Sequence, residues 1–309
     1  MPTPDMRVWM GRVDAADGPR ALRWHQCVRP LTPGCHSGLA LLGFASDEGV
    51  QRNGGRIGAK DGPRAIRSAL ANLAWNQERP VYDAGDVRCI DGDLEAAQAR
   101  LSEAVAGIIA EGHRPLILGG GHETAWGTFQ GIATARPSAK IGVINIDAHL
   151  DLRADRPANS GTPFHQIAEW CQANGLAFKY CCLGYSAQSN TAALSDRATA
   201  LGAVSLRDTE LLPWQLEPVL QRIAAFVEPC DCIHLSIDLD VLPASVMPAV
   251  SAPAARGVSL EAVEQIVRHI LALGKTVAID IVELNPTFDI DGRGAKVAAH
   301  IAWHVASHS

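Results

Sequence analysis

The stretch that decides the fold is Ile-Gly-Val-Ile-Asn-Ile-Asp-Ala-His-Leu-Asp at 141–151, an apolar run that ends in three potential metal ligands. Its first part, 141–146, is short and almost continuously hydrophobic, which is typical of a strand buried on both faces. Successive side chains of an extended chain point to opposite faces, so Asp147, His149 and Asp151 all point the same way. Unpaired carboxylates are costly to bury, and the pattern therefore predicts a cation at the end of this strand.

Two further apolar runs end in the same way. The run 233–237 is followed by Asp238 and Asp240, again at alternate positions, and the run 115–118 is followed by three glycines and His122. Ligands of open parallel α/β sheets bind outside the carboxyl ends of the strands, so we expect these side chains to meet. The predicted metal ligands are His122, Asp147, His149, Asp151, Asp238 and Asp240.

The rest of the chain predicts an α/β fold. Apolar runs alternate with segments of helical periodicity such as 63–73, 94–111 and 259–273, and this alternation indicates a largely parallel sheet covered by helices. No linker rich in Pro, Gly or Ser divides the chain, so we expect one domain over residues 1–309, with 1–38 as an N-terminal extension packed on it. The predicted strands are 39–44, 115–118, 141–146, 178–183, 233–237 and 276–282.

Composition narrows the range of partners. The formal charge is −6 and the basic residues form no stripe, so we expect no nucleic-acid partner. No window approaches the apolar length of a membrane span, and residues 1–13 lack the apolar core of a secretory signal. The 8 cysteines form no Cys-x-x-Cys pair and lie mostly in apolar contexts, which favours reduced thiols in a cytoplasmic protein.

The donor set itself indicates which metal to expect. Four carboxylates would neutralise two divalent cations, and an oxygen-rich set favours manganese over metals that prefer thiolates. A pair of divalent ions can lower the pKa of a shared water toward neutrality and so provide a nucleophile for hydrolysis. The residues alone therefore predict a hydrolase with two Mn²⁺ ions per chain, acting on a small-molecule substrate.

The motifs also resemble those of a known family, the ureohydrolases, which include arginase, agmatinase and formimidoylglutamase. The resemblance rests on Gly-Gly-Gly-His-Glu at 119–123, Asp-Ala-His-Leu-Asp at 147–151, Ser-Ile-Asp-Leu-Asp-Val-Leu at 236–242 and Asp-Ile-Val-Glu-Leu-Asn-Pro at 280–286. It implies a three-layer arginase-like α/β fold with a mostly parallel sheet of about eight strands. It also implies hydrolysis of a C–N bond at an amidine-like carbon, and a homo-oligomer.

The resemblance assigns roles to the ligands. It implies that one ion is held by His122, Asp147, Asp151 and Asp238, and the other by Asp147, His149, Asp238 and Asp240. Asp147 and Asp238 would then bridge the two ions. Glu283 matches the family's carboxylate that pairs with the cationic amidine of the substrate; the alternative is a strand-end charge in solvent.

Within the family, the chain most resembles the formimidoylglutamase branch, through the segments 43–50, 52–56 and 250–257. That branch hydrolyses N-formimidoyl-L-glutamate to L-glutamate and formamide in histidine degradation. Arg153 stands where arginases carry a neutral Asn, and a guanidinium suits a dicarboxylate substrate. Arg256 is a second candidate for binding a carboxylate, and for both arginines the alternative is a surface residue.

The sequence departs from arginase and agmatinase at the proton shuttle. Those enzymes carry His-Gly in the loop after the second metal motif, whereas this chain has Ser-Gly-Thr-Pro-Phe at 160–164, so the shuttle position is interpreted as Ser160, which we count among the substrate-binding residues. His165 is expected to replace the shuttle if the loop folds back, since a His near neutral pKa suits proton transfer. A surface histidine is the alternative.

Three other functions remain open at this point. An agmatinase-like or guanidinobutyrase-like enzyme would release urea, although Arg153 would repel a cationic substrate tail such as that of agmatine. A noncatalytic scaffold of the same fold would have no reason to gather four mutually repulsive carboxylates. A mononuclear zinc deacetylase would not need both His122 and His149 together with Asp240.

Overall fold

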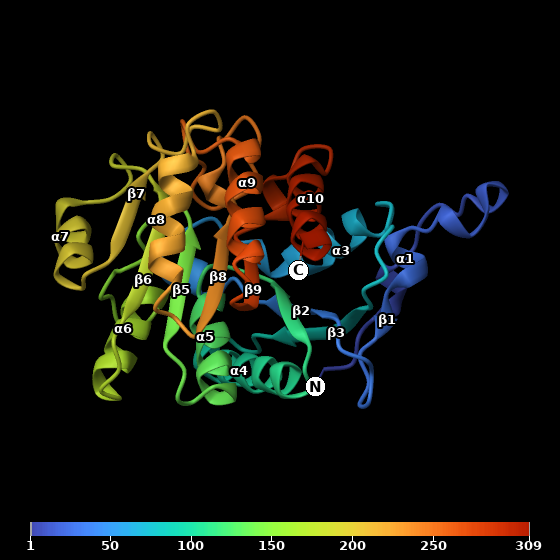
Figure 1. The fold of residues 1–309 in the computed structure, drawn as a ribbon, viewed down its shortest axis with the longest axis horizontal. Helices are drawn as coiled ribbons and strands as arrows, with labels where there is room; N and C mark the ends of the chain where they lie inside the picture. The colour runs from blue at the N-terminus through green and yellow to red at the C-terminus, as the bar shows by residue number, and fades with distance from the viewer. Residues whose placement is uncertain (1, 309) are drawn as a thin grey trace.

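A computed structural model describes residues 2–308, which form one parallel sheet with helices on both faces (Figure 1). The strand order is β1-β3-β2-β4-β9-β8-β5-β6-β7. The strands are β1 (Arg29–Pro30), β2 (Leu39–Ala45), β3 (Val81–Arg88), β4 (Arg114–Leu118), β5 (Ile141–Ile146), β6 (Lys179–Tyr185), β7 (Val204–Arg207), β8 (Cys232–Asp238) and β9 (Thr276–Val282). The predicted α/β class is confirmed, and the short edge strand β1 makes the sheet slightly larger than expected.

Two helical layers cover the sheet. The helices are α1 (Trp24–Cys27), α2 (Glu48–Arg52), α3 (Gly62–Leu70), α4 (Leu94–Ala110), α5 (Thr124–Ala135), α6 (Pro163–Ala173), α7 (Ala192–Ala200), α8 (Glu217–Val227), α9 (Leu260–Ala272) and α10 (Arg293–His308). Helices α3, α8, α9 and α10 share one hydrophobic cluster with the sheet, while α4, α5, α6 and α7 contribute to clusters on the opposite face (Figure 1). The sheet is therefore buried on both sides, as its apolar strands require.

The predicted strands all occur, with ends shifted by at most two residues. Helix α9 begins as expected after Ser259, whose side chain accepts a hydrogen bond from the amide of Ala262. Strand β3 was missed because Asp83, Gly85 and Asp86 interrupt its apolar pattern. Asp83 is nevertheless buried, because the guanidinium of Arg67 lies 3.0 Å from it.

The N-terminal segment lies beside β3 and supplies the edge strand β1, at the right-hand end of Figure 1. The indole of Trp24 lies between those of Trp9 and Trp75, with ring centroids 6.4 Å and 4.7 Å apart. The Nε1 of Trp9 donates a hydrogen bond of 2.7 Å to Asp83. Residues 29–30 form strand β1, which pairs with β3, so part of the N-terminal segment belongs to the sheet itself. The division into one domain with an extension over 1–38 stays a prediction.

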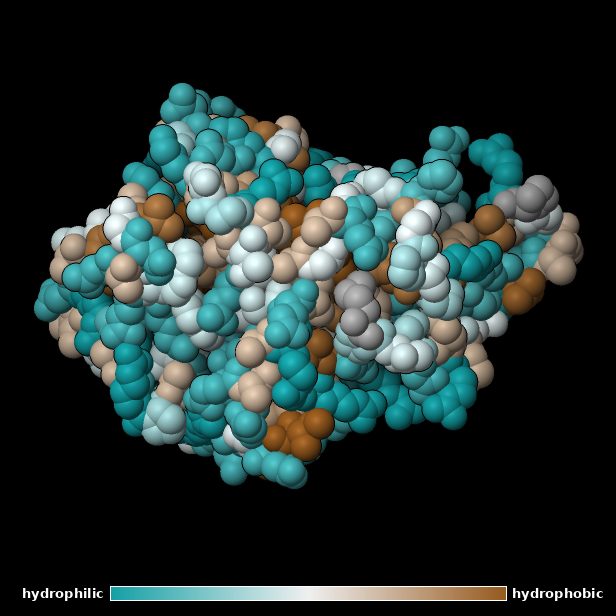
Figure 2. All heavy atoms as spheres, turned by 90° about the horizontal axis from the view of Figure 1, so that it is seen from below, coloured by the Kyte–Doolittle hydropathy of each residue, from teal (hydrophilic) through white to brown (hydrophobic). Residues whose placement is uncertain are grey.

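Surface and thiol properties agree with the sequence. Figure 2 shows a face that is largely hydrophilic, with hydrophobic residues scattered across it. Within residues 2–308, none of the helices has the length and apolarity needed to cross a bilayer. All the cysteines are free thiols.

The strand order places four strand ends together. Strands β4 and β5 follow one another in the sequence, but β9 and β8 lie between them in the sheet. Strands β8 and β5 are neighbours, but the chain continues from β8 to β9 and from β5 to β6, in opposite directions along the sheet, which opens a crevice at their carboxyl ends. The loops after β4, β5, β8 and β9 surround this crevice.

Candidate metal centre

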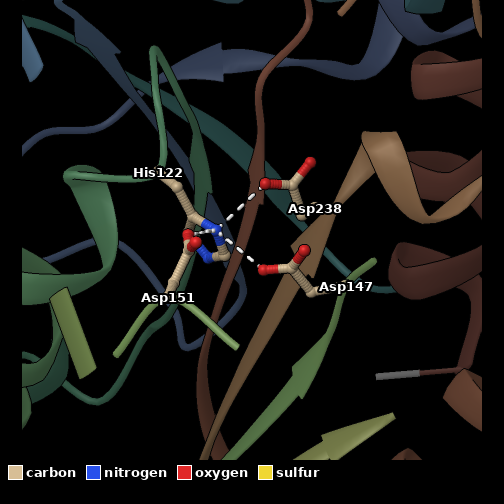
Figure 3. Close-up of side chains that lie close together, drawn as sticks. All are labelled: His122, Asp147, Asp151 and Asp238. Atoms are coloured by element: carbon tan, nitrogen blue, oxygen red, sulfur yellow. Dashed lines mark ion pairs between the residues drawn. The ribbon is translucent and has the colours of Figure 1, made fainter. Parts of the chain in front are cut away.

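His122, in the loop between β4 and α5, lies at the middle of one group of donors (Figure 3). Its Nδ1 lies 3.2 Å from Asp147 Oδ2, 2.9 Å from Asp151 Oδ2 and 3.0 Å from Asp238 Oδ2. One ligand atom from each of these side chains lies within 4.8 Å of all the others. These are the predicted ligands of the first ion, and the structure brings all of them together.

The other nitrogen of His122 fixes the tautomer of its ring. Ser236 Oγ donates its single hydrogen to Asp280, so it accepts from His122 Nε2 at 2.9 Å. Asp280 in turn lies 2.5 Å from His234 Nε2. With the ring hydrogen on Nε2, the Nδ1 lone pair faces three carboxylates, and Nδ1 makes no hydrogen bond. A lone pair directed at carboxylate oxygens is repulsive unless a cation lies between them, so these residues fit a metal ion.

A second group of donors shares Asp147 with the first. It contains Asp147, His149 and Asp240, with His149 Nδ1 2.9 Å from Asp240 Oδ2 and 3.5 Å from Asp147 Oδ1. The two carboxylate oxygens of Asp147 thus face the two groups separately. Asp238, the other expected bridge, belongs to the first group alone and accepts a 2.8 Å hydrogen bond from the amide of Asp240.

The site concentrates negative charge in a buried place. Burial, followed by repulsion from Asp240 and Asp147, raises the pKa of Asp238 well above its ordinary value. Burial raises the pKa of Asp240 to about 6. The oxygen-rich donor set and its surplus of negative charge suit a hard divalent cation such as manganese.

Two site residues have left-handed backbone conformations, which are uncommon outside glycine. Asp151 has φ 45° and Glu283 has φ 72°. Such conformations cost free energy and persist when the surrounding structure enforces them, often at functional sites. Each turns the chain sharply at the mouth of the crevice, just after β5 and β9 respectively.

Glu283 is directed into the site with one oxygen free. Its Oε1 accepts a 2.9 Å hydrogen bond from the backbone N–H of His122, whereas its Oε2 is buried without a hydrogen-bond partner. Burial, followed by repulsion from Glu123 and Asp240, raises the pKa of Glu283 to about 8. A cationic group beside Oε2 would relieve both effects. The solvated alternative does not hold for this side chain, which is 5% exposed.

A cavity of about 120 Å³ lies over these residues. Arg153 and Ser160 line it together with Asp151, Asp240 and Glu283. The backbone N–H of Arg153 donates to the carbonyl of Gly161 at 2.9 Å, which closes the loop between the two lining residues. Two long loops contribute to the cavity wall, 153–162 through these residues and 240–257 through Ser251 and Ala252.

Two predicted site residues are not brought to the cavity. His165 lies on α6 with its Nε2 3.4 Å from Glu169 Oε1, and it is not among the lining residues. The neighbouring Phe164 faces the metal group instead, with its ring centroid 5.2 Å from that of His122. Arg256 is exposed and also lies outside the cavity lining. The loop does not fold back to bring His165 to the cavity, because the preceding residue, Phe164, is buried against His122 and Tyr180.

Other residues of the cavity wall were missed by sequence reasoning. Asn53 follows α2 and donates a 3.1 Å hydrogen bond to Ser160 Oγ. Ser189 and Asn190 come from the loop between β6 and α7, and Ser251 from the loop after β8. The segment 52–56 was noted as family-like, which could have drawn attention to Asn53. The segment 250–257 likewise contains Ser251, whereas nothing in the local pattern marks Ser189 and Asn190.

Comparison with known proteins gives concordant matches. The model of the Arginase family matches residues 37–307. A formimidoylglutamase of Chromobacterium violaceum is 53% identical over 304 residues, covering 98% of each chain. A formimidoylglutamase of Aeromonas hydrophila is 52% identical over 301 residues, covering 96% of each chain. The crystal structure of Trypanosoma cruzi formiminoglutamase with Mn²⁺ superposes with a TM-score of 0.79 at 29% identity, covering 87% of this chain and 92% of the other.

Proposed function

We propose, because the chain belongs to the arginase family, that it is a manganese hydrolase that converts N-formimidoyl-L-glutamate to L-glutamate and formamide. The predicted family and its formimidoylglutamase branch are confirmed by the relatives described above. The enzyme class is that of hydrolases acting on amidine-type C–N bonds. The substrate follows from relatives at about half identity over nearly the whole chain, read together with the polar groups of the cavity.

One observation carries the proposal. The cavity places a buried carboxylate with a free oxygen, Glu283, and a guanidinium, Arg153, around the same donor groups. A formimidoyl-glutamate has the complementary charges, with a cationic amidine at one end and carboxylates at the other. Opposite charges brought together in a partly dry cavity give both affinity and orientation.

Glu283 and Arg153 would have separate roles in the reaction. When bound, manganese supplies positive charge that makes water acidic enough to attack near neutral pH. Glu283 Oε2 would hold the amidinium, and Arg153 would hold a carboxylate, so the amidine carbon is fixed over the donor groups. The oxygen of water bonds to that carbon, the bond from carbon to the glutamate nitrogen breaks, and this nitrogen gains a proton.

We propose two ions per chain, held by the two donor groups that share Asp147. A bridging carboxylate lets the two ions share one set of ligands, and separate oxygens of Asp147 already face the two groups. The relay from His122 through Ser236 to Asp280 would keep the imidazole of the first group in its metal-binding tautomer. Ser160 would contact the substrate, while the proton-shuttle role expected for His165 receives no support from its position on α6.

The wider setting is also proposed. The free thiols suit a reducing compartment, and we propose that the enzyme acts in the cytoplasm, in the degradation of histidine. We further propose that it forms a homo-oligomer and has no nucleic-acid or membrane partner. These proposals rest on the composition, on the family and on the substrate.

The decisive experiment is a substrate panel. Protein reconstituted with Mn²⁺ is incubated with N-formimidoyl-L-glutamate and, separately, with arginine, agmatine and 4-guanidinobutyrate. We expect formamide and glutamate from the first compound and little urea from the others. Urea release from a guanidino compound without turnover of formimidoyl-glutamate would refute the proposal. The urea-releasing alternative is disfavoured because Arg153 would repel the cationic tail of agmatine.

A further inference from the structure

The backbone after β5 carries half of the metal donors, yet it departs from the sheet within a few residues. The amide of Asp147 donates to Leu183 at 3.0 Å and the carbonyl of Ala148 accepts from Ser186 at 2.8 Å, which are the last sheet-like bonds to this segment. Leu150, two residues on, is 1% exposed, so its amide needs a partner within the protein. No strand reaches that far.

The side chain of Asn190 takes the place of the missing strand. Its Oδ1 accepts from the amide of Leu150 at 2.9 Å, and its Nδ2 donates to the carbonyl of Ala148 at 3.0 Å. The same Nδ2 donates to the carbonyl of Ser186 at 2.9 Å, which ties the carboxamide to its own loop. Asn190 therefore hydrogen-bonds to the backbone on both sides of His149.

Asn190 has no hydrogen left to donate to a substrate. A carboxamide offers two N–H hydrogens and one carbonyl oxygen, and here both hydrogens and the oxygen are engaged by the backbone. The residue lines the cavity but is 8% exposed. Its position is fixed by the start of α7, two residues later.

A second side chain holds the same loop from below. The hydroxyl of Tyr180, on β6, donates to the carbonyl of Leu150 at 2.8 Å and accepts from Asn145 Nδ2 at 3.1 Å. Both polar backbone atoms of Leu150 are thus bound by side chains. The loop is held from two directions, and Asn190 is the contact that flanks His149.

We propose that Asn190 is a positioning residue of the metal centre. It fixes the backbone at Ala148 and Leu150, so the imidazole of His149 faces Asp240 and Asp147 before any ion arrives. This inference rests on the proposed two-ion site. It predicts that loss of the carboxamide weakens the ion held by His149, the residue between Ala148 and Leu150, more than the other ion, because two ligands of that ion, His122 and Asp238, come from other strand ends.

The test is metal binding to the whole chain, without substrate. Mn²⁺ is titrated calorimetrically into the metal-free protein, and bound metal is counted after gel filtration. For Asn190→Ala we expect about a 10–100-fold weaker second ion, with a much smaller change in the first, as is typical when a residue that orients a ligand is lost. The control is Gln188→Ala, an exposed residue of the same loop, which should bind both ions like the unmodified protein.

A second variant keeps the proposal testable if Asn190→Ala fails to fold. Asn190→Asp is of equal size and keeps the acceptor for Leu150, but it opposes a carboxylate to the carbonyls of Ala148 and Ser186. If Asn190 positions the loop, this variant binds the second ion more weakly despite its added negative charge. Unchanged or tighter binding, or equal weakening of both ions, would overturn the proposal. Because no turnover is measured, this outcome is independent of whether the proposed substrate is correct.

Discussion

Charged residues are buried in two places in this protein, and they are neutralised in different ways. Between α3 and β3, the guanidinium of Arg67 lies 3.0 Å from Asp83 and 2.6 Å from Asp86, and Arg67 is 3% exposed. At the ends of β4, β5 and β8, carboxylates surround two imidazoles with no Lys or Arg paired to them in the described residues. The first cluster contains its own counter-charge, whereas the second requires one from outside.

The difference separates a structural cluster from a functional one. The buried ion pair of Arg67 and Asp83 connects α3 to β3 and needs no ligand to balance its charge. An incomplete cluster raises the pKa of its acids, as seen for Asp238 and Glu283, and leaves atoms such as Glu283 Oε2 without partners. Strongly perturbed acids at a cavity are therefore more informative about function than buried charge alone.

The largest effect should follow from removing a ligand of the incomplete cluster. Asp238→Ala deletes one of three carboxylates around His122 Nδ1, and we expect loss of most bound Mn²⁺ and a fall in kcat/KM of about 1,000-fold or more. Metal content and formamide release measure the two effects. Asp231→Ala, at the exposed opposite end of β8, is the matched control. Two ions per chain in Asp238→Ala would contradict the ligand assignment.

Disruption of the cluster of Arg67, Asp83 and Asp86 should lower the stability of the protein without lowering its activity. Arg67→Met leaves Asp83 and Asp86 without their cation, and we expect the free energy of unfolding to fall by about 3–5 kcal/mol. Urea unfolding measures this loss. Arg64→Met, exposed on the same helix, should change it little. If folded Arg67→Met protein had lost its activity as well, the two clusters would not be functionally separate.

A smaller effect should distinguish the two candidate arginines. Arg153 lines the cavity and Arg256 does not, so we expect Arg153→Ala to raise KM about 10–100-fold while metal content stays the same. Arg256→Ala should leave KM and metal content near their original values. Steady-state kinetics on the two variants decide between them. A larger effect from Arg256→Ala would mean that its loop reaches the substrate.

The smallest effect concerns the metal-free protein and pH. Burial raises the pKa of Asp240 to about 6 and of Glu283 to about 8, so the folded state holds protons that the unfolded chain releases at lower pH. Stability is therefore present below the unfolded pKa, near 4, and falls as pH rises through about 6 to 8. In EDTA we expect Tm to fall by a few degrees over this range, and saturating Mn²⁺ should remove the dependence. A Tm that rises with pH over this range in EDTA would contradict this prediction.

The sequence predicted those parts of the molecule whose neighbours are set by a strand. The run 141–146 had to be buried on both faces, and the residues following it at alternate positions had to share a face, so Asp147 and Asp151 were found beside His122. Strand β3 was missed because Asp83 is buried through a partner, Arg67, that local pattern does not reveal. Asn53 and Asn190 were missed because loop positions depend on the path of the whole chain.

The order of the strands also determines when the site can exist. Strands β4 and β5 are made early, but the two strands that lie between them, β8 and β9, are the last of the sheet to be synthesised. A nascent chain that ends before residue 232 has a gap at the centre of its sheet and lacks Asp238, Asp240 and Glu283. The centre of the protein is therefore completed last, and no N-terminal fragment can hold both ions. Premature termination would yield an inert polypeptide with an open sheet, which favours aggregation.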